Sequence, residues 1–304
     1  MEIRQLKYFL KVAETLNFSE ASRCLFITQS TLSQQISKLE FELGQQLFER
    51  DSHSVVLTEA GRELQKYARD TINSVSDCMQ HMQDLKEMLT GELNIGVTFS
   101  FSSIASEAIL TFLKKYPKIK LNVWYKTMEE LMDMLKRREL DLVLAFKPSQ
   151  SDSHIDSRVL FNNYLAAIVN EDHPLASHKS ITLSELQLFS LVLPSRGLQA
   201  RNTFEEILVD KDVNLNVCVD LNNVNQILGV VRNSNYVTVL SESTIFNEEG
   251  LKAIRLDCSN NNMEGCVHIL RDAYIKKSTQ EFIKILSESR AILKMFALRG
   301  LIKD

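Results

Sequence analysis

The chain lacks the marks of membrane, secreted and disulfide-bonded proteins. None of its apolar runs approaches the roughly 18 residues that a membrane-spanning helix needs, so we expect no membrane partner. The first 22 residues carry charges throughout and no small-residue cleavage site, so we expect no signal peptide and a cytoplasmic location. The five cysteines are odd in number, widely spread and without a C-x-x-C pair, which argues against a disulfide scaffold or a zinc site.

Enzyme signatures are also missing. The sequence contains no G-x-G-x-x-G loop, no Walker loop and no H-E-x-x-H pair. His173 and His178 flank a proline turn, and two histidines on such a bent loop rarely converge on one metal ion. A redox pair of Cys258 with Cys266 remains an alternative for two of the cysteines. We therefore expect no catalytic residue, no metal site and no cofactor.

A basic excess, the usual mark of a nucleic-acid-binding protein, is missing as well. The formal net charge is −4, and residues 1–57 carry six lysines and arginines against seven acidic residues. Charge alone therefore gives no support for DNA binding. The pattern of residues in the N-terminal segment has to decide that question.

The N-terminal segment shows a pattern of three helices. Apolar residues at steps of three and four make residues 3–16 an amphipathic helix. Ser19 is a suitable N-cap for a second, short helix over Glu20–Phe26, and Thr28 for a third. Gly44 supplies the left-handed end of the third helix. The inward stripe of this helix is Leu32, Ile36, Leu39 and Leu43.

The outward face of the third helix carries short hydroxyl and amide side chains with one cation. A helix that only has to stay soluble usually carries Glu and Lys pairs instead. Hydroxyls and amides let a helix approach base edges and phosphates, and glutamine can form two hydrogen bonds with adenine. The pattern favours a helix-turn-helix, with a small helical bundle as the alternative. The predicted DNA-contacting residues of this helix are Thr28, Gln29, Ser30, Thr31, Ser33, Gln34, Ser37 and Lys38.

A short hairpin, or wing, is predicted after this helix. Leu47-Phe48 and Val55–Leu57 are apolar runs around a polar tip, Asp51–Ser54. Arg50 and His53 near the tip are candidates for contacts with a phosphate or the minor groove. For either residue, an ordinary solvated loop position is the alternative.

The stretch from Leu6 to Gly61 resembles the winged helix-turn-helix of the LysR-type transcriptional regulators. Two positions depart from the family pattern, because Ser30 stands where proline is most common and His53 where arginine is usual. The near-neutral charge is also low for the family. The matching elements are Ala21-Ser22, Thr28-Gln29-Ser30, Leu32-Ser33, Gln35-Ile36, Leu39-Glu40, Leu43-Gly44, Leu47-Phe48, Arg50 and Leu57-Thr58-x-Ala60-Gly61.

A long helix without proline is predicted from Thr58 to about Leu89. One set of its residues steps alternately by four and three, a 3.5-residue repeat typical of the seam of a two-helix coiled coil. At 1.5 Å per residue such a helix is about 45–50 Å long. We interpret it as a dimerisation helix, with packing on its own domain as the alternative. The predicted seam residues are Leu64, Ala68, Thr71, Val75, Cys78, Met82, Leu85 and Leu89.

From Gly91 on, predicted strands and helices alternate, which indicates α/β layers. In LysR-type regulators this region is similar to a periplasmic binding protein, with a ligand cleft between two α/β lobes. The resemblance therefore implies an α+β multidomain fold. Its parts are an N-terminal winged helix-turn-helix over 1–57, a long linker helix over 58–90 and a C-terminal two-lobed effector domain over 91–304. Lobe I is expected at 91–161 and 268–304, and lobe II at 162–267.

Two strand-to-helix corners of this region suit a small anion. At the first, hydroxyls join free backbone amides and the positive end of a helix dipole, although ordinary N-capping accounts for some of them. At the second, arginines suit a carboxylate, with a surface salt bridge as the alternative. These corners match effector-lining positions of the family, and the aromatic residues form either a pocket wall or core. The expected effector-binding residues are Thr98, Phe99, Ser100, Phe101, Ser102, Phe146, Lys147, Ser195, Arg196, Arg201, Leu240 and Ser241.

The leading hypothesis is a sequence-specific transcription regulator controlled by a small anionic metabolite. The resemblance implies palindromic half-sites in double-stranded DNA, a homodimer or homotetramer, and RNA polymerase as a partner. A second hypothesis, from another class, is a cytosolic solute-binding or enzymatic α/β protein with an accessory helical domain.

Overall fold

The computed structural model describes residues 1–51, 54–84, 90–148, 150, 152–209, 211–246, 248–259, 261–290 and 292. The chain divides into two compact units, Met1–Glu87 and Met88–Asp304. Among the described helices, none combines the length and the apolar character needed to cross a membrane.

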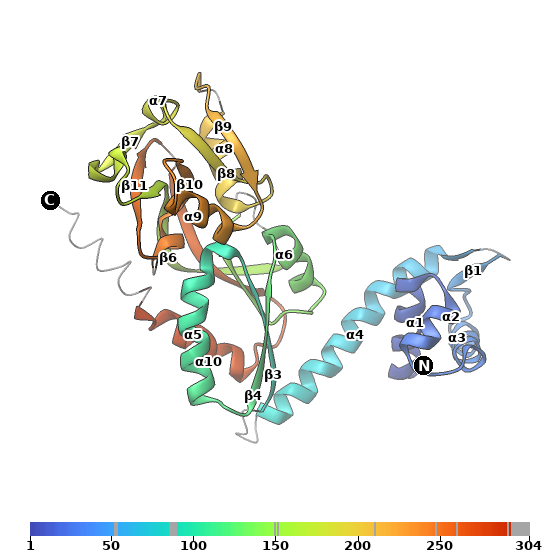
Figure 1. Cartoon of the computed structure of the whole chain (residues 1–304). Coiled ribbons are helices and arrows are strands. Elements are labelled where there is room, and N and C mark those ends of the chain that lie inside the picture. The colour runs from blue at the N-terminus through green and yellow to red at the C-terminus, as the bar shows by residue number, and fades with distance from the viewer. Residues whose placement is uncertain are drawn as a thin grey trace. The chain divides into compact units, whose positions relative to one another are not determined.

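The N-terminal unit has the predicted order of three helices, a hairpin and a long helix (Figure 1). Its core is built from the inward faces of the helices, with Phe9 and Phe48 ring to ring at 5.4 Å. Leu32, Ile36 and Leu39 are fully buried, whereas Leu43 at the end of the predicted stripe is 38% exposed. The elements are α1 (Ile3–Thr15), α2 (Phe18–Cys24), α3 (Gln29–Leu43), β1 (Phe48–Arg50), β2 (Val55–Leu57) and α4 (Glu59–Asp84).

The helix ends follow local capping chemistry. The prediction that Ser19 caps the second helix is wrong, because Asn17 has the extended backbone of an N-cap and its Oδ1 accepts the Glu20 amide at 3.0 Å. Ser19 lies inside α2 instead, with its Oγ 3.1 Å from Gln29 Oε1. The caps of α3 are confirmed: Thr28 Oγ1 accepts the Thr31 amide at 3.2 Å, and Gly44 ends the helix with φ +65°.

Helix α4 starts as predicted after Thr58, whose Oγ1 accepts the Gly61 amide at 2.9 Å. Its first half belongs to the core of the N-terminal unit, where Ala68 is buried and Leu64 and Ile72 are partly buried. Residues 85–89, the predicted end of the helix, lie outside the described residues.

The second unit alternates strands and helices (Figure 1). Helices α5 and α10 lie side by side against the sheet, with Phe112 and Phe282 ring to ring at 5.4 Å (Figure 1). The elements are β3 (Gly91–Val97), η1 (Phe99–Phe101), α5 (Ser102–Lys115), β4 (Ile119–Tyr125), α6 (Met128–Lys136), β5 (Leu142–Phe146), β6 (Ile155–Asn170), η2 (Pro174–Ser177), β7 (Ser180–Thr182), α7 (Leu183–Leu186), β8 (Ser190–Pro194), α8 (Gln199–Leu208), β9 (Asn216–Leu221), α9 (Val224–Arg232), β10 (Thr238–Ser241), η3 (Glu242–Ile245), β11 (Leu251–Asp257), β12 (Asn262–Leu270) and α10 (Lys277–Ser287).

One long strand joins the two lobes. Strand β6 pairs with β12 over Ile155–Tyr164, and over Leu165–Asn170 it pairs with β10 and β11. The first lobe thus contains β3, β4 and β5 with β12, while the second contains the pairs around β10 and β11 and the parallel pair β8–β9. Strand β12 pairs with β6 from Asn262 and with β5 from Gly265 on, whereas the boundary between the lobes was expected after residue 267.

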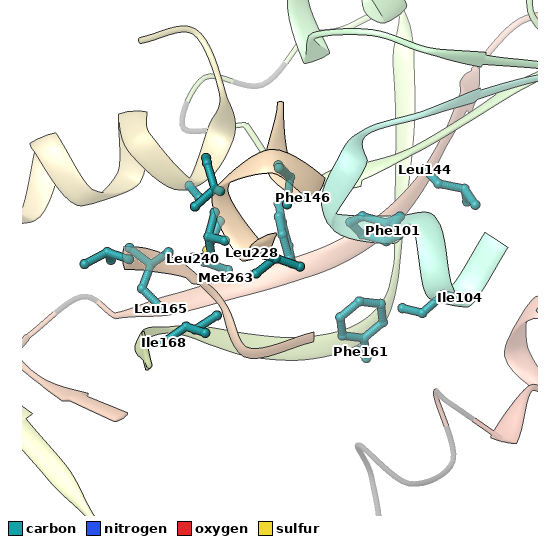
Figure 2. Close-up of a cluster of buried hydrophobic side chains, with 14 of the residues drawn as sticks. Phe101, Ile104, Leu144, Phe146, Phe161, Leu165, Ile168, Leu228, Leu240 and Met263 are labelled. Atoms are coloured by element: carbon teal, nitrogen blue, oxygen red, sulfur yellow. The ribbon is translucent and has the colours of Figure 1, made fainter. Parts of the chain in front are cut away.

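A cluster of aromatic rings packs beneath this crossover (Figure 2). Phe101 lies 5.0 Å from Phe146 and 5.4 Å from Phe161 between ring centroids, and all three are buried. Gly265 lies against the Phe161 ring, so that a Cβ added there would overlap three of the ring carbons. Register shifts in β12 at this point, between Gly265 and Cys266. The glycine is thus required by close packing.

We predict that Gly265→Ala lowers the free energy of unfolding by about 2–3 kcal/mol, because the packed ring has no space to move into. Urea or thermal unfolding of the full chain measures the change. Gly229→Ala is the matched control in the same unit. An added Cβ there meets nothing within 4 Å, and alanine raises helix stability by about 0.5–1 kcal/mol. Equal unfolding midpoints for the two variants would contradict the assigned packing.

Candidate DNA-reading surface and ligand cleft

The outward face of α3 is open to solvent. Its predicted contact residues Thr28, Gln29, Ser30, Thr31, Gln34, Ser37 and Lys38 are exposed, and Ser33 is half-buried. Within the described part of the chain, Ser33, Gln34 and Ser37 form no side-chain hydrogen bond. The first turn is organised by local bonds, with Thr28 Oγ1 2.8 Å from Thr31 Oγ1 and 3.0 Å from Ser30 Oγ. These three side chains are therefore not needed to hold the helix in place.

The predicted cations of this unit already have acidic neighbours. Lys38 Nζ lies 3.9 Å from Glu2, while Arg50 lies 3.3 Å from Glu40 and 4.4 Å above the Phe18 ring. Glu40 also accepts the Leu47 amide at 2.9 Å, so Arg50 helps to fix the hairpin to α3. His53 lies outside the described residues.

Arg23 on α2 is a cation that the sequence analysis missed. It is exposed, its Nε donates to the Ser19 carbonyl at 3.4 Å, and no carboxylate pairs with it among the described residues. The sequence shows that Arg23 lies shortly before α3. It does not show that Lys38 and Arg50 lie near carboxylates and that Arg23 does not. Of these side chains, Arg23 is the better placed to meet a phosphate.

The predicted seam on α4 divides into two parts. Leu64 and Ala68 pack into the core of their own unit. Thr71, Val75, Cys78 and Met82 are exposed, and Leu85 and Leu89 lie outside the described residues. The neighbouring Met79 is 64% exposed. An apolar stripe therefore remains uncovered on the second half of the described helix.

In the second unit, one side chain bridges the two lobes. Gln199, the first residue of α8, donates from Nε2 to the Phe146 carbonyl at 2.7 Å, and its Oε1 accepts the Phe146 amide at 3.0 Å. Phe146 is the last residue of β5, so its backbone groups have reached the end of the sheet. We call this two-bond contact the Gln199 clasp. Sequence reasoning missed Gln199, because a glutamine after a glycine turn is common.

Three cavities of very different size meet at the clasp. Gln199 and Met128 line all three, with volumes of about 20, 360 and 690 Å³. The smallest is lined by Thr98, Phe99, Ser100 and Leu240 from the predicted set. At about 20 Å³ it has room for roughly one water molecule. The expected ligand corner is thus closed by Gln199 and Met128 in this conformation.

The structure brings together about half of the predicted effector residues. Phe146 and Lys147 line the cavity of about 360 Å³. Phe101 belongs to the buried aromatic cluster, which was the alternative for at least one phenylalanine. Ser102 Oγ donates to the Phe99 carbonyl at 2.7 Å, and Ser241 is buried beside Asn163 at 2.8 Å. Ser195 is half-buried and lines none of the three cavities.

The two arginines do not face the cleft as expected. Arg201 is buried and donates to Asp220 at 2.5 Å, to Glu205 at 2.8 Å and to the Pro194 carbonyl at 3.1 Å. Arg196 is 81% exposed and pairs with Glu205 at 3.0 Å. The alternative of a surface salt bridge fits Arg196, whereas Arg201 forms a buried ion pair.

The lysines that line the cavities are paired in the same way. Lys126 lies 2.9 Å from Glu130, Lys147 2.7 Å from Glu264 and Lys136 2.7 Å from Asp152. Hydrogen bonds from Lys126 and Thr127 lower the pKa of Glu130 to about 2. Burial lowers the pKa of His268, beside the largest cavity, to about 4, so the imidazole is neutral at pH 7. Hydroxyl and amide donors, rather than free cations, therefore dominate the cleft.

Comparison with known protein families matches both units. Residues 3–62 match the family model described as the bacterial regulatory helix-turn-helix protein of the lysR family. Residues 86–291 match the LysR substrate binding domain. The chain belongs to the LysR family. This confirms the resemblance and the fold class, and it sets aside the solute-binding or enzymatic alternative, since LysR proteins are DNA-binding transcription regulators with an effector-binding domain.

Individual relatives agree with the LysR assignment. The chain is 29% identical over 248 residues to an uncharacterised HTH-type transcriptional regulator, YvbU, of Bacillus subtilis, covering 81% of this chain and 83% of that protein. A full-length cysteine-to-aspartate variant of OxyR from Pseudomonas aeruginosa has the same fold, with a TM-score of 0.68 at 21% identity over 96% of this chain and 94% of that one. The CcmR regulatory domain of Synechocystis, solved with 2-PG, gives a TM-score of 0.59 at 20% identity over 66% of this chain and 97% of that one.

For this LysR-family chain we predict that Gln199→Ala opens the clasp. Hydrogen exchange at the Phe146 amide should accelerate about tenfold, and the free energy of unfolding should fall by about 1–2 kcal/mol, because two backbone groups lose their partner. Thr203→Ala is the control, since Thr203 lies one turn along α8 and lines the middle cavity without crossing between lobes. Unchanged protection of Phe146 in Gln199→Ala would show that the clasp does not form in solution.

Proposed function

We propose that this LysR-family protein reads paired half-sites in double-stranded DNA with α3 and answers to a small polar metabolite bound between its two lobes. The observation that carries the first part is the outward face of α3, where the exposed Gln34 and Ser37 and the half-buried Ser33 form no side-chain hydrogen bond within the described part of the chain. Helix-turn-helix proteins place the first turns of such a helix against base edges in the major groove. Short side chains permit that approach.

We infer that two copies act together through α4. The predicted seam residues Val75, Cys78 and Met82 are exposed, as is the neighbouring Met79, and a coiled-coil seam requires such an uncovered stripe. Two copies would present two α3 helices to a palindromic site, and the second contact adds affinity without further charge. This offsets the near balance of charges in residues 1–57. A homotetramer, contact with RNA polymerase and a cytoplasmic location complete the proposal.

We propose the corner of Thr98, Phe99 and Ser100 as the place where the metabolite docks. Hydroxyls of Thr98, Ser100 and Thr127 line this corner, and η1 begins there. Thr98 donates to the Leu144 carbonyl and Thr127 to Glu130, so Ser100 is the hydroxyl that is left for a ligand. Because the lining cations are paired, hydrogen-bond donors have to hold an anionic group, which favours a single carboxylate over a strongly charged ligand. CcmR with 2-PG shows a related domain occupied by a small molecule. Coupling between ligand and DNA is typically about 1–3 kcal/mol in allosteric proteins.

The DNA proposal is tested with Ser33→Ala and Gln34→Ala in the full chain. We expect each to weaken binding to the duplex that the wild-type protein selects from random sequences by about 10- to 100-fold, because a base contact is lost. Binding to a scrambled duplex and thermal stability should stay unchanged, since neither side chain bonds within the chain. Gln65→Ala on α4 is the control. Wild-type affinity for both α3 variants would refute the assigned reading face.

The ligand proposal is tested by thermal-shift measurements on the full chain with small monocarboxylates, dicarboxylates and neutral polyols. We expect a monocarboxylate to raise the melting temperature by several degrees. Ser100→Ala should reduce that shift by at least half without changing the melting temperature of the free protein. Ser106→Ala, whose hydroxyl donates to the Ser102 carbonyl at 2.8 Å, is the control. If only polyols raise the melting temperature, the ligand is neutral and the proposal of an anionic ligand is wrong. If a monocarboxylate raises the melting temperature of Ser100→Ala as much as that of the wild-type protein, the ligand binds at another site.

A further inference from the structure

Phe26, in the turn between α2 and α3, has an unusual environment. Its side chain is 95% exposed, more than that of any other large apolar residue in the described part of the chain. Its backbone is left-handed, with φ +55°. Glycine or asparagine is the usual residue in this conformation, because a Cβ there crowds the backbone. A large aromatic side chain at this position therefore lowers the stability of the folded unit in two ways, because it strains the backbone and because it exposes apolar surface to water.

Neither the turn nor the core needs the ring. The turn is closed by backbone bonds alone, with the Phe26 amide donating to the Arg23 carbonyl at 3.2 Å and the Ile27 amide to the Ser22 carbonyl at 3.1 Å. Glycine would form both bonds equally well. Phe26 does not belong to the apolar core of the unit, which takes Leu25 and Ile27 on either side of it. The aromatic side chain has no structural task within this unit.

The position of Phe26 points to DNA. It lies two residues before Thr28, the N-cap of α3, and in helix-turn-helix complexes the N-terminal residues of the second helix reach the bases. Among the exposed residues close to it along the chain, Arg23, Thr28, Gln29 and Ser30 are polar. Apolar groups at such sites, phenylalanine rings among them, contact the thymine methyl group. Phe26 is thus an apolar side chain at the edge of a polar reading face.

We propose that Phe26 is a DNA-contact residue that packs on the carbon surface of the half-site, a thymine methyl group or a deoxyribose. This contact rests on the proposed reading of DNA by α3 and adds an apolar component to it. It also explains why a strained and exposed phenylalanine stands where glycine would give a more stable turn.

Phe26→Gly in the full chain tests this contact, with the duplex that the wild-type protein selects from random sequences as the probe. We expect affinity to fall about tenfold, from the loss of a buried aromatic contact. The slope of binding against salt concentration should not change, since no phosphate contact is lost. The melting temperature should be equal or higher, because glycine relieves the left-handed strain. Phe26→Tyr keeps the ring and should bind within about twofold of wild type.

Arg138→Gly is the matched control, because Arg138 has a similar φ of +57° in the other unit. It should leave DNA affinity unchanged. Replacing each thymine of the duplex in turn by uracil distinguishes the two carbon surfaces. If Phe26 contacts a thymine methyl group, uracil at one position should weaken the binding of the wild-type protein but not that of Phe26→Gly. If Phe26 contacts a deoxyribose, no position should show this difference between the two proteins.

Wild-type affinity in Phe26→Gly would overturn the proposal, as would a loss of affinity accompanied by a lower melting temperature. Such an outcome leaves the role of α3 intact. Failure of the wild-type protein to select any sequence would instead refute the reading of DNA itself.

Discussion

Buried backbone groups must find hydrogen-bond partners, and this requirement shapes the effector domain. Strand β6 satisfies it by changing partners midway, from β12 in one lobe to β10 and β11 in the other. The same requirement explains the Gln199 clasp. Strand β12 pairs with Phe146 on one side, but β3 on the other side reaches only as far as Leu144. A side chain from the opposite lobe therefore takes both backbone groups of Phe146. The cleft is thus closed by the same chemistry that builds the sheet.

This closure links the lobes to the proposed ligand site. Gln199 and Met128 border each of the three cavities, so any change at the clasp alters the space at the Thr98 and Ser100 corner. A ligand that binds one arrangement of the lobes better than the other shifts their populations by its differential affinity. The clasp contributes two hydrogen bonds to that balance, an amount comparable with a typical allosteric coupling energy.

The constraint on the N-terminal unit is different, because α3 has to be held in place while one of its faces stays open to solvent. Three fully buried residues, Leu32, Ile36 and Leu39, fix it from behind, and Glu40 ties it to the hairpin. Two cations of the unit, Arg50 and Lys38, also have partners within it, because each lies near a carboxylate. If α3 reads DNA as proposed, recognition would depend on close approach by hydroxyls, amides and an exposed phenylalanine rather than on a general attraction to phosphate.

Local patterns in the sequence determined the three helices, the caps at Thr28 and Gly44, the hairpin, the start of α4 and the alternation of the effector domain. They did so because capping, periodicity and turn chemistry act between residues close along the chain. Even locally, competition between neighbours was decided by geometry: Asn17 and not Ser19 caps α2, because the chain leaves α1 through a left-handed Leu16. Only the tertiary structure decided which polar side chains are already paired with other groups of the chain. Arg201 meets Asp220 nineteen positions on, Lys147 meets Glu264, and Gln199 reaches Phe146 across the lobes. These pairings join residues far apart in sequence, so no pattern of spacing contains them.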